Sequence, residues 1–261
     1  MTSIRLSTVT GWKKLKYLMM EEVEKMADGE IRLDQPEMQE FVKYYKKASD
    51  FSSRNEAGAQ PVQKLIQKLD QLQNYRDLQR EAADLTLSGV YLPFEFGISP
   101  DMKDTEHYAL YLGTPDTILP DKTYYGTEQG DQLLVVFQDM MKQVLALMGI
   151  EEDRIGRLLE GALAFDRLLS ERVKTREEEA DYTKKYNPRS REEVKEYSRL
   201  LDLPDVIGEL IGQEPDQVIV AHPEFYEGYD EIVNPDNFED VKSWMVIHTL
   251  NSRTDVLSEE I

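Results

Sequence analysis

The sequence has 261 residues, enough for one large domain or two small ones with a sizeable buried core. It has 31 basic and 51 acidic residues, and the net charge of −20 excludes a protein that binds nucleic acid through a basic surface. It has no cysteine, which excludes disulfides and thiol nucleophiles and favours a reducing compartment. We interpret the acidity as a solvated exterior rather than as an acidic recognition surface.

The hydropathy pattern argues against a membrane protein. No apolar run approaches the roughly 20 residues that cross a bilayer, and the N-terminal segment lacks the pattern of a secretion signal. We therefore expect a soluble cytoplasmic protein with neither a membrane nor a nucleic-acid partner.

Apolar residues at helical spacing predict that most of the chain is helical. The first predicted helices cover residues 12–26, 38–48, 62–72 and 77–88. Gly29 and Gly89 end the first and the last of these, because glycine readily adopts the left-handed conformation that closes a helix. A break at residues 55–61, which contains glycine and proline, separates the second helix from the third.

Residues 92–126 interrupt the helical pattern. Apolar and polar residues alternate at 94–99 and again at 108–112, which is the period of half-buried strands. The intervening loop is rich in proline, aspartate and lysine, so we predict a loose β-hairpin at about residues 94–112. A turn at residues 119–126 follows and carries the adjacent tyrosines Tyr124 and Tyr125.

Helical patterns resume after this turn. A wide apolar stripe at residues 131–148 predicts a deeply buried helix. The next helix, at 155–173, is expected to continue through the charged run 174–181. Ser190 and Glu193 form a predicted capping box that opens a helix to Leu201.

The last part of the chain combines short helices with one strand. A β-branched run at residues 217–221 predicts a strand, and helices are expected at 204–212 and 224–232. A final helix begins after Asn234, and its apolar residues share one face: Phe238, Val241, Trp244, Met245 and His248.

The predicted fold class is therefore mainly α, a multi-helix lobe with a small β-hairpin at about residues 94–112 and a short strand near residues 217–221. Because no internal repeat or long linker divides the sequence, we expect residues 1–261 to form a single mainly helical domain.

The histidines do not form a recognisable metal motif. His107 heads a predicted strand, His222 precedes a proline and His248 lies on a helix face, and no two of them are within four residues of each other. We interpret all three as structural residues. Serine-nucleophile and phosphate-loop motifs are also missing, since Gly208 and Gly212 are not followed by the required lysine and hydroxyl residue.

Paired carboxylates and aromatic residues are the remaining candidates for a site. Asp101 with Asp104 and Glu192 with Glu193 can be read as acid and base, but a turn and the first turn of a helix favour acidic residues for structural reasons. Six aromatic residues can be read as a cavity lining, although core packing is the preferred interpretation. They are Tyr44, Tyr45, Tyr124, Tyr125, Phe225 and Tyr226.

The segment from Leu92 to Gly126 contains a strand, a DxKDxxxY turn, a second strand and an LPDxxYY element in this order. This order resembles the N-terminal helical region of the neprilysin family of zinc metallopeptidases, most closely the bacterial oligoendopeptidase O type. Residues 44–69, 158–171 followed by 186–194, and 218–250 agree with the same resemblance.

The resemblance implies a non-zinc lobe of a metalloendopeptidase that hydrolyses short peptides. In such enzymes two histidines four residues apart, a glutamate between them and a downstream E-N-x-x-D glutamate provide the zinc ligands and the general base, and all belong to the C-terminal half. We therefore assign no catalytic, cofactor-binding or metal-binding residue here. Zinc is expected in the full-length enzyme and not in this chain, which is predicted to be inactive alone.

The resemblance also implies the partners of the chain. They are the C-terminal zinc-binding half of the same enzyme, over which this lobe closes to restrict substrate size, and short peptides. The family places an arginine four residues before an aromatic residue and an acidic residue just after it, near the substrate's C-terminal end. Thr8 and Lys13 stand at those positions around Trp12, so no substrate-binding residue is transferred.

Two other functions remain open at this point. The alternative from a different class is a catalytically inactive helical module that binds a peptide or a protein. A hydrolase that uses only carboxylates is the third, and it requires activity that persists without metal. The missing motifs also lead us to expect that the sequence is a fragment, an expressed segment or the product of a truncated gene.

Overall fold

A computed structural model describes residues 2–259, with side chains from residue 11 onward except that of residue 255. These residues belong to two compact units, one ending at Ala57 and the other beginning at Gly58. This division does not test the expected single domain over residues 1–261, which stays a prediction.

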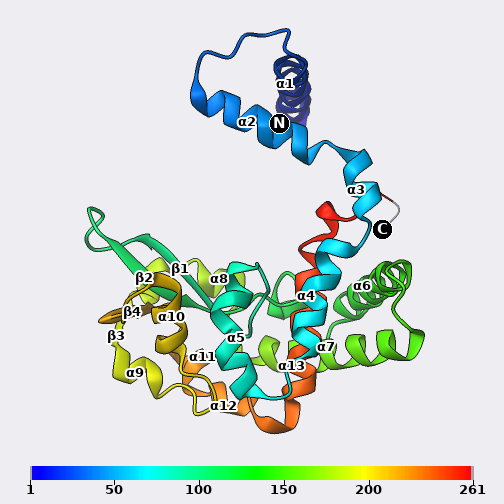
Figure 1. Cartoon of the computed structure of the whole chain (residues 1–261). Coiled ribbons are helices and arrows are strands. Elements are labelled where there is room, and N and C mark those ends of the chain that lie inside the picture. The colour runs from blue at the N-terminus through cyan, green and yellow to red at the C-terminus, as the bar shows by residue number, and fades with distance from the viewer. Residues whose placement is uncertain (1, 260–261) are drawn as a thin grey trace. The chain divides into compact units, whose positions relative to one another are not determined.

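The first unit is entirely helical in its regular structure (Figure 1). It contains α1 (Thr2–Asp28), α2 (Pro36–Ala48) and α3 (Phe51–Ala57). The predicted helices at 12–26 and 38–48 are confirmed, whereas α3 was not predicted. The break expected at 55–61 is shorter in the structure, because α3 ends at Ala57 and α4 begins at Gln60. Gly58, between them, has a φ of +56°.

Helix α1 buries little of its apolar stripe within this unit. Val23 and Met26 are partly buried where α1 contacts α2, and Val42 of α2 is buried. Towards the N-terminus, in contrast, Trp12 is 69% exposed and Met19 is 60% exposed.

The second unit holds most of the fold. Its helices are α4 (Gln60–Asp70), α5 (Tyr75–Leu87), α6 (Glu128–Leu147), α7 (Glu152–Arg172), α8 (Arg176–Glu179), α9 (Arg191–Lys195), α10 (Leu203–Ile211), α11 (Pro223–Glu227), α12 (Tyr229–Ile232) and α13 (Phe238–Asn251). Its strands are β1 (Glu95–Pro100), β2 (Tyr108–Gly113), β3 (Asn187–Ser190) and β4 (Gln217–Val220). Short 3₁₀ helices lie at Lys122–Tyr124, Tyr182–Lys185, Pro235–Asn237 and Thr254–Val256.

The mainly α class, the hairpin and the strand near 217–221 are confirmed. The strands form one mixed sheet in the order β1-β2-β4-β3. Strands β1 and β2 are antiparallel, with Glu95 opposite Gly113, whereas β4 runs parallel to β2. Strand β3 was not predicted because its Pro188 is typical of a break, but an edge strand tolerates a proline.

The hairpin is less buried than its alternating pattern predicts. Phe94 and Leu112, at the base of the hairpin, are buried, but Ile98 is 63% exposed and Tyr108 is 75% exposed. Figure 1 shows the reason, because the far half of the hairpin extends beyond the rest of the second unit. The expectation of two half-buried strands is therefore correct only for the base.

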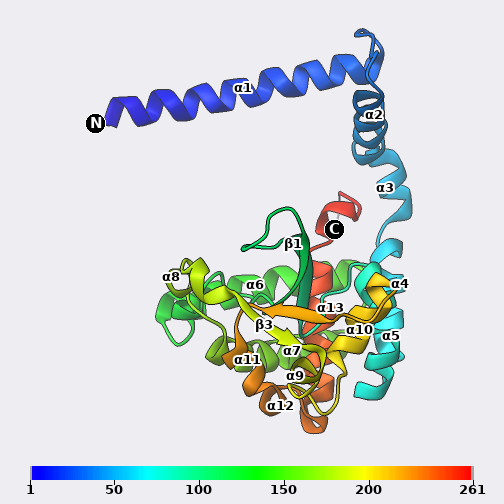
Figure 2. The same cartoon turned by 90° about the vertical axis from the view of Figure 1, so that its left-hand side faces the viewer.

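The core of the second unit is built around α7 and α13, which cross and pack against each other, and the sheet lies to one side of α13 (Figures 1 and 2). Trp244 of α13 is fully buried and meets Phe165 of α7 edge to face, with ring centroids 5.6 Å apart. Residues all around α13 are buried rather than only the predicted single face, as expected for a central helix.

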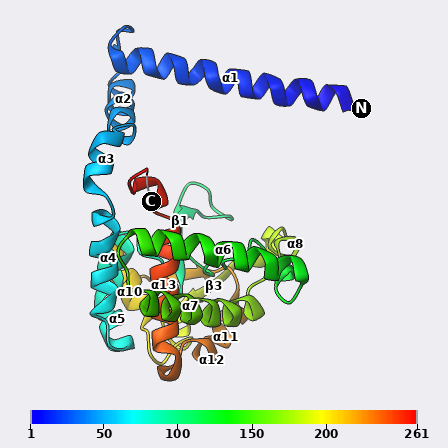
Figure 3. The ribbon, with the colours of Figure 1, turned by 90° about the vertical axis from the view of Figure 1, so that its right-hand side faces the viewer.

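Helix α6 lies at the periphery, contrary to the predicted deep burial. It packs against α7 (Figure 3), and this contact buries Leu134, Met141 and Leu145. Val135 and Val136, on the other side of α6, are exposed. The stripe is wide enough for a core helix, but a neighbouring helix covers only part of it.

Three predicted helices differ in length from those observed. Helix α7 ends at Arg172 instead of continuing through the charged run, because Val173 is extended and Thr175 caps the separate helix α8. The capping box of Ser190 and Glu193 is confirmed, but α9 ends at Lys195 rather than at Leu201. The predicted helix at 224–232 is divided at Gly228 into α11 and α12.

Among the described residues, no helix is both long enough and apolar enough to cross a lipid bilayer.

Candidate functional site

The three histidines occupy three different surroundings. His107 is exposed in the hairpin loop, where its Nδ1 lies 2.8 Å from Oδ2 of Asp104. His222 is buried, with Nε2 2.6 Å from Oε1 of Glu179. His248 is buried in α13, and its ring centroid lies 4.2 Å from that of Trp244.

These surroundings do not fit a zinc site. Across the residues that the structure describes, no three histidine, aspartate or glutamate side chains are grouped so that they could hold a metal ion. The absence of metal ligands from the whole chain stays a prediction.

The carboxylate pairs serve local structure. Asp101 accepts hydrogen bonds from the backbone amide of Lys103 at 2.7 Å and from the Tyr186 hydroxyl at 3.1 Å, and chiefly the first of these lowers its pKa. Glu193 accepts the backbone amide of Ser190 at 2.7 Å, which lowers the pKa of Glu193. Both arrangements are those of a turn and a helix cap.

The aromatic candidates divide between core and surface. Phe225 and Tyr226 are buried in the core, as the preferred interpretation expects, and the Tyr226 hydroxyl donates to the carbonyl oxygen of Gly113. Tyr124 and Tyr125 are partly buried. Tyr44, in the first unit, is 74% exposed, so core packing is the wrong interpretation for this residue.

A buried carboxylate organises the turn that contains Tyr125. Asp166 of α7 is fully buried and accepts the Ile118 amide at 2.8 Å, the Tyr125 hydroxyl and, at 3.4 Å, the indole N–H of Trp244. Burial and the charge of Asp166 raise the pKa of Tyr125. Nε2 of the buried His248 lies 3.9 Å from Oδ1 of Asp166, too far for a hydrogen bond. With its three donors arranged around one carboxylate, the network stabilises the turn.

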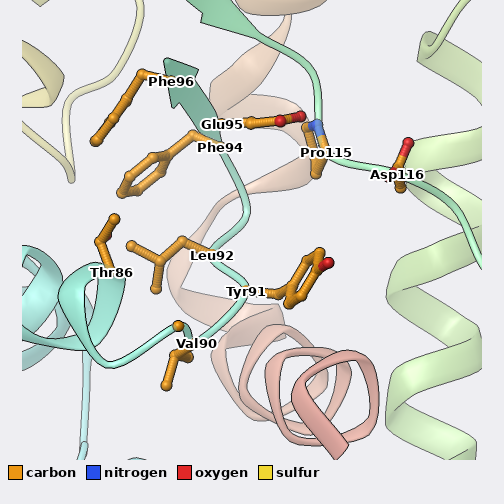
Figure 4. Close-up of a pocket in the computed structure, with 10 residues that line it drawn as sticks. Thr86, Val90, Tyr91, Leu92, Phe94, Glu95, Phe96, Pro115 and Asp116 are labelled. Atoms are coloured by element: carbon orange, nitrogen blue, oxygen red, sulfur yellow. The ribbon is translucent and has the colours of Figure 1, made fainter. Parts of the chain in front are cut away.

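A pocket of about 250 Å³ lies where the chain leaves α5 and enters β1 (Figure 4). Its lining combines apolar and aromatic side chains with two carboxylates. The lining residues are Thr86, Gly89, Val90, Tyr91, Leu92, Phe94, Glu95, Phe96, Pro115 and Asp116. In Figure 4, Phe94 and Phe96 point to one side of the extended segment, whereas Glu95 points towards Pro115.

Glu95 and Asp116 are the charged groups of this pocket. Neither side chain makes an ion pair or accepts a hydrogen bond from the residues that the structure describes. Both side chains are exposed to solvent along part of their length. Partial desolvation of the Glu95 carboxyl raises its pKa, and the negative charge of Asp116 raises it further. The pocket therefore has, beside an apolar wall, two exposed carboxylates without an ion-pair partner in the described part of the chain.

A second pocket, of about 370 Å³, adjoins the first and shares Glu95, Pro115 and Asp116 with it. Its basic side chains already have partners. Lys174 pairs with Glu224, Lys185 pairs with Glu179, Lys122 donates to the Val173 carbonyl oxygen and Arg176 donates to the Pro120 carbonyl oxygen. Burial lowers the pKa of His222 at this pocket, and the nearby charge of Glu179 opposes that shift.

Sequence reasoning assigned no residue to either pocket. The sequence offered one indication for Glu95, which is a lone acidic residue between Phe94 and Phe96. It offered no indication for Asp116, because Asp116 comes near Glu95 only through the hairpin register that places Glu95 opposite Gly113.

Comparison with known proteins identifies relatives along nearly the whole chain. The sequence model of peptidase family M13 matches residues 6–261. The neutral endopeptidase of Lactobacillus helveticus is 33% identical over 250 residues, which cover 95% of this chain and 38% of that protein. The neutral endopeptidase of Lactococcus lactis subsp. cremoris is 34% identical over 231 residues, with 87% of this chain and 36% of that protein covered.

Solved structures show the same partial coverage. The crystal structure of PEPO from Lactobacillus rhamnosis HN001 is similar with a TM-score of 0.84 and 26% identity, over 95% of this chain and 39% of that one. The zinc metalloprotease ZMP1 of Mycobacterium tuberculosis in its open state shares the fold, with a TM-score of 0.80 and 19% identity, over 95% of this chain and 39% of that one. The chain thus spans less than two fifths of the length of these relatives.

Proposed function

The chain belongs to peptidase family M13 as an N-terminal domain of a neprilysin-type peptidase, and on this premise we propose that it is the helical lobe of a zinc-dependent endopeptidase that hydrolyses short peptides. The observation that carries the proposal is the family match over residues 6–261 combined with relatives that are more than twice as long. The name of one further relative, a putative zinc metalloproteinase of Streptococcus gordonii, supports zinc as the metal of the whole enzyme.

We propose a geometric role for this lobe. A C-terminal half would provide the zinc ion, which polarises the scissile carbonyl and activates water. The residues of this chain would close over that half, exclude bulk water and admit only peptides small enough to enter the enclosed space. A cytoplasmic location belongs to the same proposal and is favoured by the cysteine-free sequence.

Exposed apolar side chains support the proposal that another protein surface packs on this chain. Trp12, Tyr17 and Met19 of α1 are all more than half exposed, and so are Ile98 and Tyr108 of the hairpin. Grouped apolar side chains on a protein surface commonly mark a contact with another protein surface. A C-terminal half that packs on this chain would remove part of that surface from water.

The test is complementation between separate halves. The purified chain is mixed with the C-terminal part of the Lactobacillus helveticus neutral endopeptidase, and cleavage of a short fluorogenic peptide is followed with zinc content. We expect no cleavage by either part alone, cleavage on mixing, and loss of cleavage with a chelator. The relative's own N-terminal part, mixed in the same way, is the positive control.

Two outcomes would contradict the proposal. Cleavage by this chain alone that persists with chelator would indicate a hydrolase that uses carboxylates. Peptide binding by this chain without any complementation, while the positive control works, would favour the catalytically inactive binding module.

A further inference from the structure

We propose that the pocket at the start of β1 binds a short peptide through an apolar side chain placed against Phe94 and a positive charge placed at Glu95 and Asp116. The inference rests on the proposed function for its class of ligand, a short peptide, and adds a preference for peptides that carry a positive charge next to an apolar residue.

The apolar part of the pocket is preformed. Val90, Leu92 and Phe94 are buried and held in the core, and the rings of Phe94 and Phe96 stack with centroids 5.5 Å apart. Tyr91 at the rim is held by its backbone amide, which donates to Oγ1 of Thr249 at 3.1 Å. A wall that is already in place binds an apolar side chain without first having to order itself.

The charged part of the pocket lacks a cation. Glu95 and Asp116 both line it, and neither pairs with a lysine or an arginine in the part of the chain that the structure describes. Neighbouring carboxylates repel each other, and a cation between them relieves that repulsion. A positively charged ligand group therefore complements this end of the pocket.

The adjoining pocket contains basic side chains, but they are engaged with other groups of the protein. Lys174 and Lys185 form ion pairs with Glu224 and Glu179, and Lys122 and Arg176 donate to backbone carbonyl oxygens. None of them pairs with Glu95 or Asp116 within the described residues, so these two carboxylates remain available to a cationic ligand group.

Strand β1 supplies a path for the peptide backbone. In the sheet order β1-β2-β4-β3 it is an edge strand, and among the described strands it pairs with β2 alone. The outer backbone groups of an edge strand can pair with an extended peptide, which is a common mode of peptide recognition. Because β1 begins at Glu95, a peptide on this edge would run directly past the pocket.

The test measures peptide binding by the whole 261-residue chain with calorimetry, without any cleavage step. The probe is the tetrapeptide Ala-Phe-Lys-Ala blocked at both ends, compared with Ala-Phe-norleucine-Ala blocked in the same way. A second pair, Phe-Ala-Ala amide with a free or an acetylated amine, distinguishes a side-chain cation from an α-amine. We expect the cationic member of at least one pair to bind about fivefold more tightly than its neutral partner.

The variants Glu95→Gln and Asp116→Asn test whether these two carboxylates bind the positive charge of the peptide. Each should reduce the affinity for the preferred cationic peptide by about threefold and leave the affinity for the neutral peptide unchanged. Glu106→Gln removes the same charge from an exposed position in the hairpin loop and should leave both affinities unchanged. Circular dichroism of each variant checks that the fold is retained.

The proposal is overturned if the chain binds no probe, if charged and neutral peptides bind equally, or if Glu106→Gln weakens binding as much as the pocket variants do. Failure of complementation with a C-terminal half leaves this measurement unaffected, because binding is recorded on the chain alone. The two proposals can therefore fail separately.

Discussion

The buried carboxylate of Asp166 accepts a hydrogen bond from the hydroxyl of Tyr125, which lies 41 residues earlier in the chain. The same carboxylate accepts a hydrogen bond from the backbone amide of Ile118. Both ends of the turn from Ile118 to Tyr125 are therefore attached to α7. Trp244 adds a bond from α13. The turn that follows the hairpin is thereby tied to both central helices.

Removing the Tyr125 hydroxyl should destabilise the second unit. In Tyr125→Phe the carboxylate of Asp166 loses a donor, and a hydrogen bond to a charged group contributes about 1.5–3 kcal/mol. We expect a decrease of that size in the free energy of unfolding, measured by urea denaturation. Tyr124→Phe is the control, since the Tyr124 hydroxyl has no hydrogen-bond partner among the described residues. Equal losses for the two variants would show that the contact with Asp166 contributes nothing specific.

Gly89 should not tolerate a side chain. It has a φ of +75°, and a Cβ there would clash with Nη2 of Arg253, which donates to the Gly89 carbonyl oxygen at 3.3 Å. Gly89→Ala is expected to lower the free energy of unfolding by about 1–3 kcal/mol.

Gly156→Ala is the matched control for this substitution. Gly156 lies inside α7, and no atom of a neighbouring element in the described part of the chain comes within 4 Å of the position that a Cβ would take. Alanine there should therefore raise the stability by about 0.5–1 kcal/mol. Destabilisation by both substitutions would contradict the predicted difference between the two sites.

Asp121 should make the stability of the folded protein depend on pH in the acidic range. It accepts the Arg176 amide at 2.7 Å, the Thr123 hydroxyl at 2.7 Å and the Thr123 amide at 2.8 Å, and these bonds, the first above all, lower its pKa to about 2. Because the folded pKa lies below the unfolded value of 3.8, the contribution is full above pH 3.8 and is lost as the pH falls towards 2. The difference in melting temperature between the wild type and Asp121→Asn should therefore shrink over this range.

Thr123→Val is the control for the pH effect. It removes the hydroxyl that donates to Asp121 at 2.7 Å but keeps the backbone donors of Thr123 and Arg176. This variant should reduce the acid dependence without abolishing it, because the Arg176 amide, the largest cause of the lowered pKa, is retained. A wild-type advantage over Asp121→Asn that is constant from pH 7 to pH 2 would refute the assignment.

The affinity of the pocket for a cationic peptide should fall in acid, and the fall should begin at a higher pH than it would for a glutamate with an ordinary pKa. Desolvation and the charge of Asp116 raise the pKa of Glu95, so Glu95 takes up its proton above the ordinary value of 4.5. Since the protonated form no longer attracts a cation, affinity for the charged tetrapeptide should fall as the pH drops through that raised pKa. Calorimetry between pH 4 and pH 8 measures this, and the neutral tetrapeptide provides the control. An identical pH profile for both peptides would contradict the role of Glu95.

The tryptophans should report separately on the two units. Trp12 is 69% exposed and Trp244 is fully buried. Acrylamide should therefore quench the wild type mainly through Trp12, and Trp12→Phe should leave a blue-shifted emission that resists quenching. Equal quenching of wild type and variant would show that Trp12 is covered in solution.

Several features of this protein were determined by the sequence alone, because they depend on neighbours a few residues away. The alternation around Phe96 predicts the hairpin, Ser190 and Glu193 predict their own capping box, and Gly89 marks the end of a helix. The order of elements at residues 92–126 was also enough to indicate the family.

Only the tertiary structure decided which surfaces are covered and which distant groups meet. The exposed Val136 of α6 has the same local pattern as a core residue, and only the number of packed neighbours distinguishes the two. Glu95 meets Asp116 through strand register, and Asp166 meets Tyr125 through the packing of α7 against a turn. Periodicity reports the face of an element, whereas such contacts depend on how separate elements pack, and no local pattern in the chain records that packing.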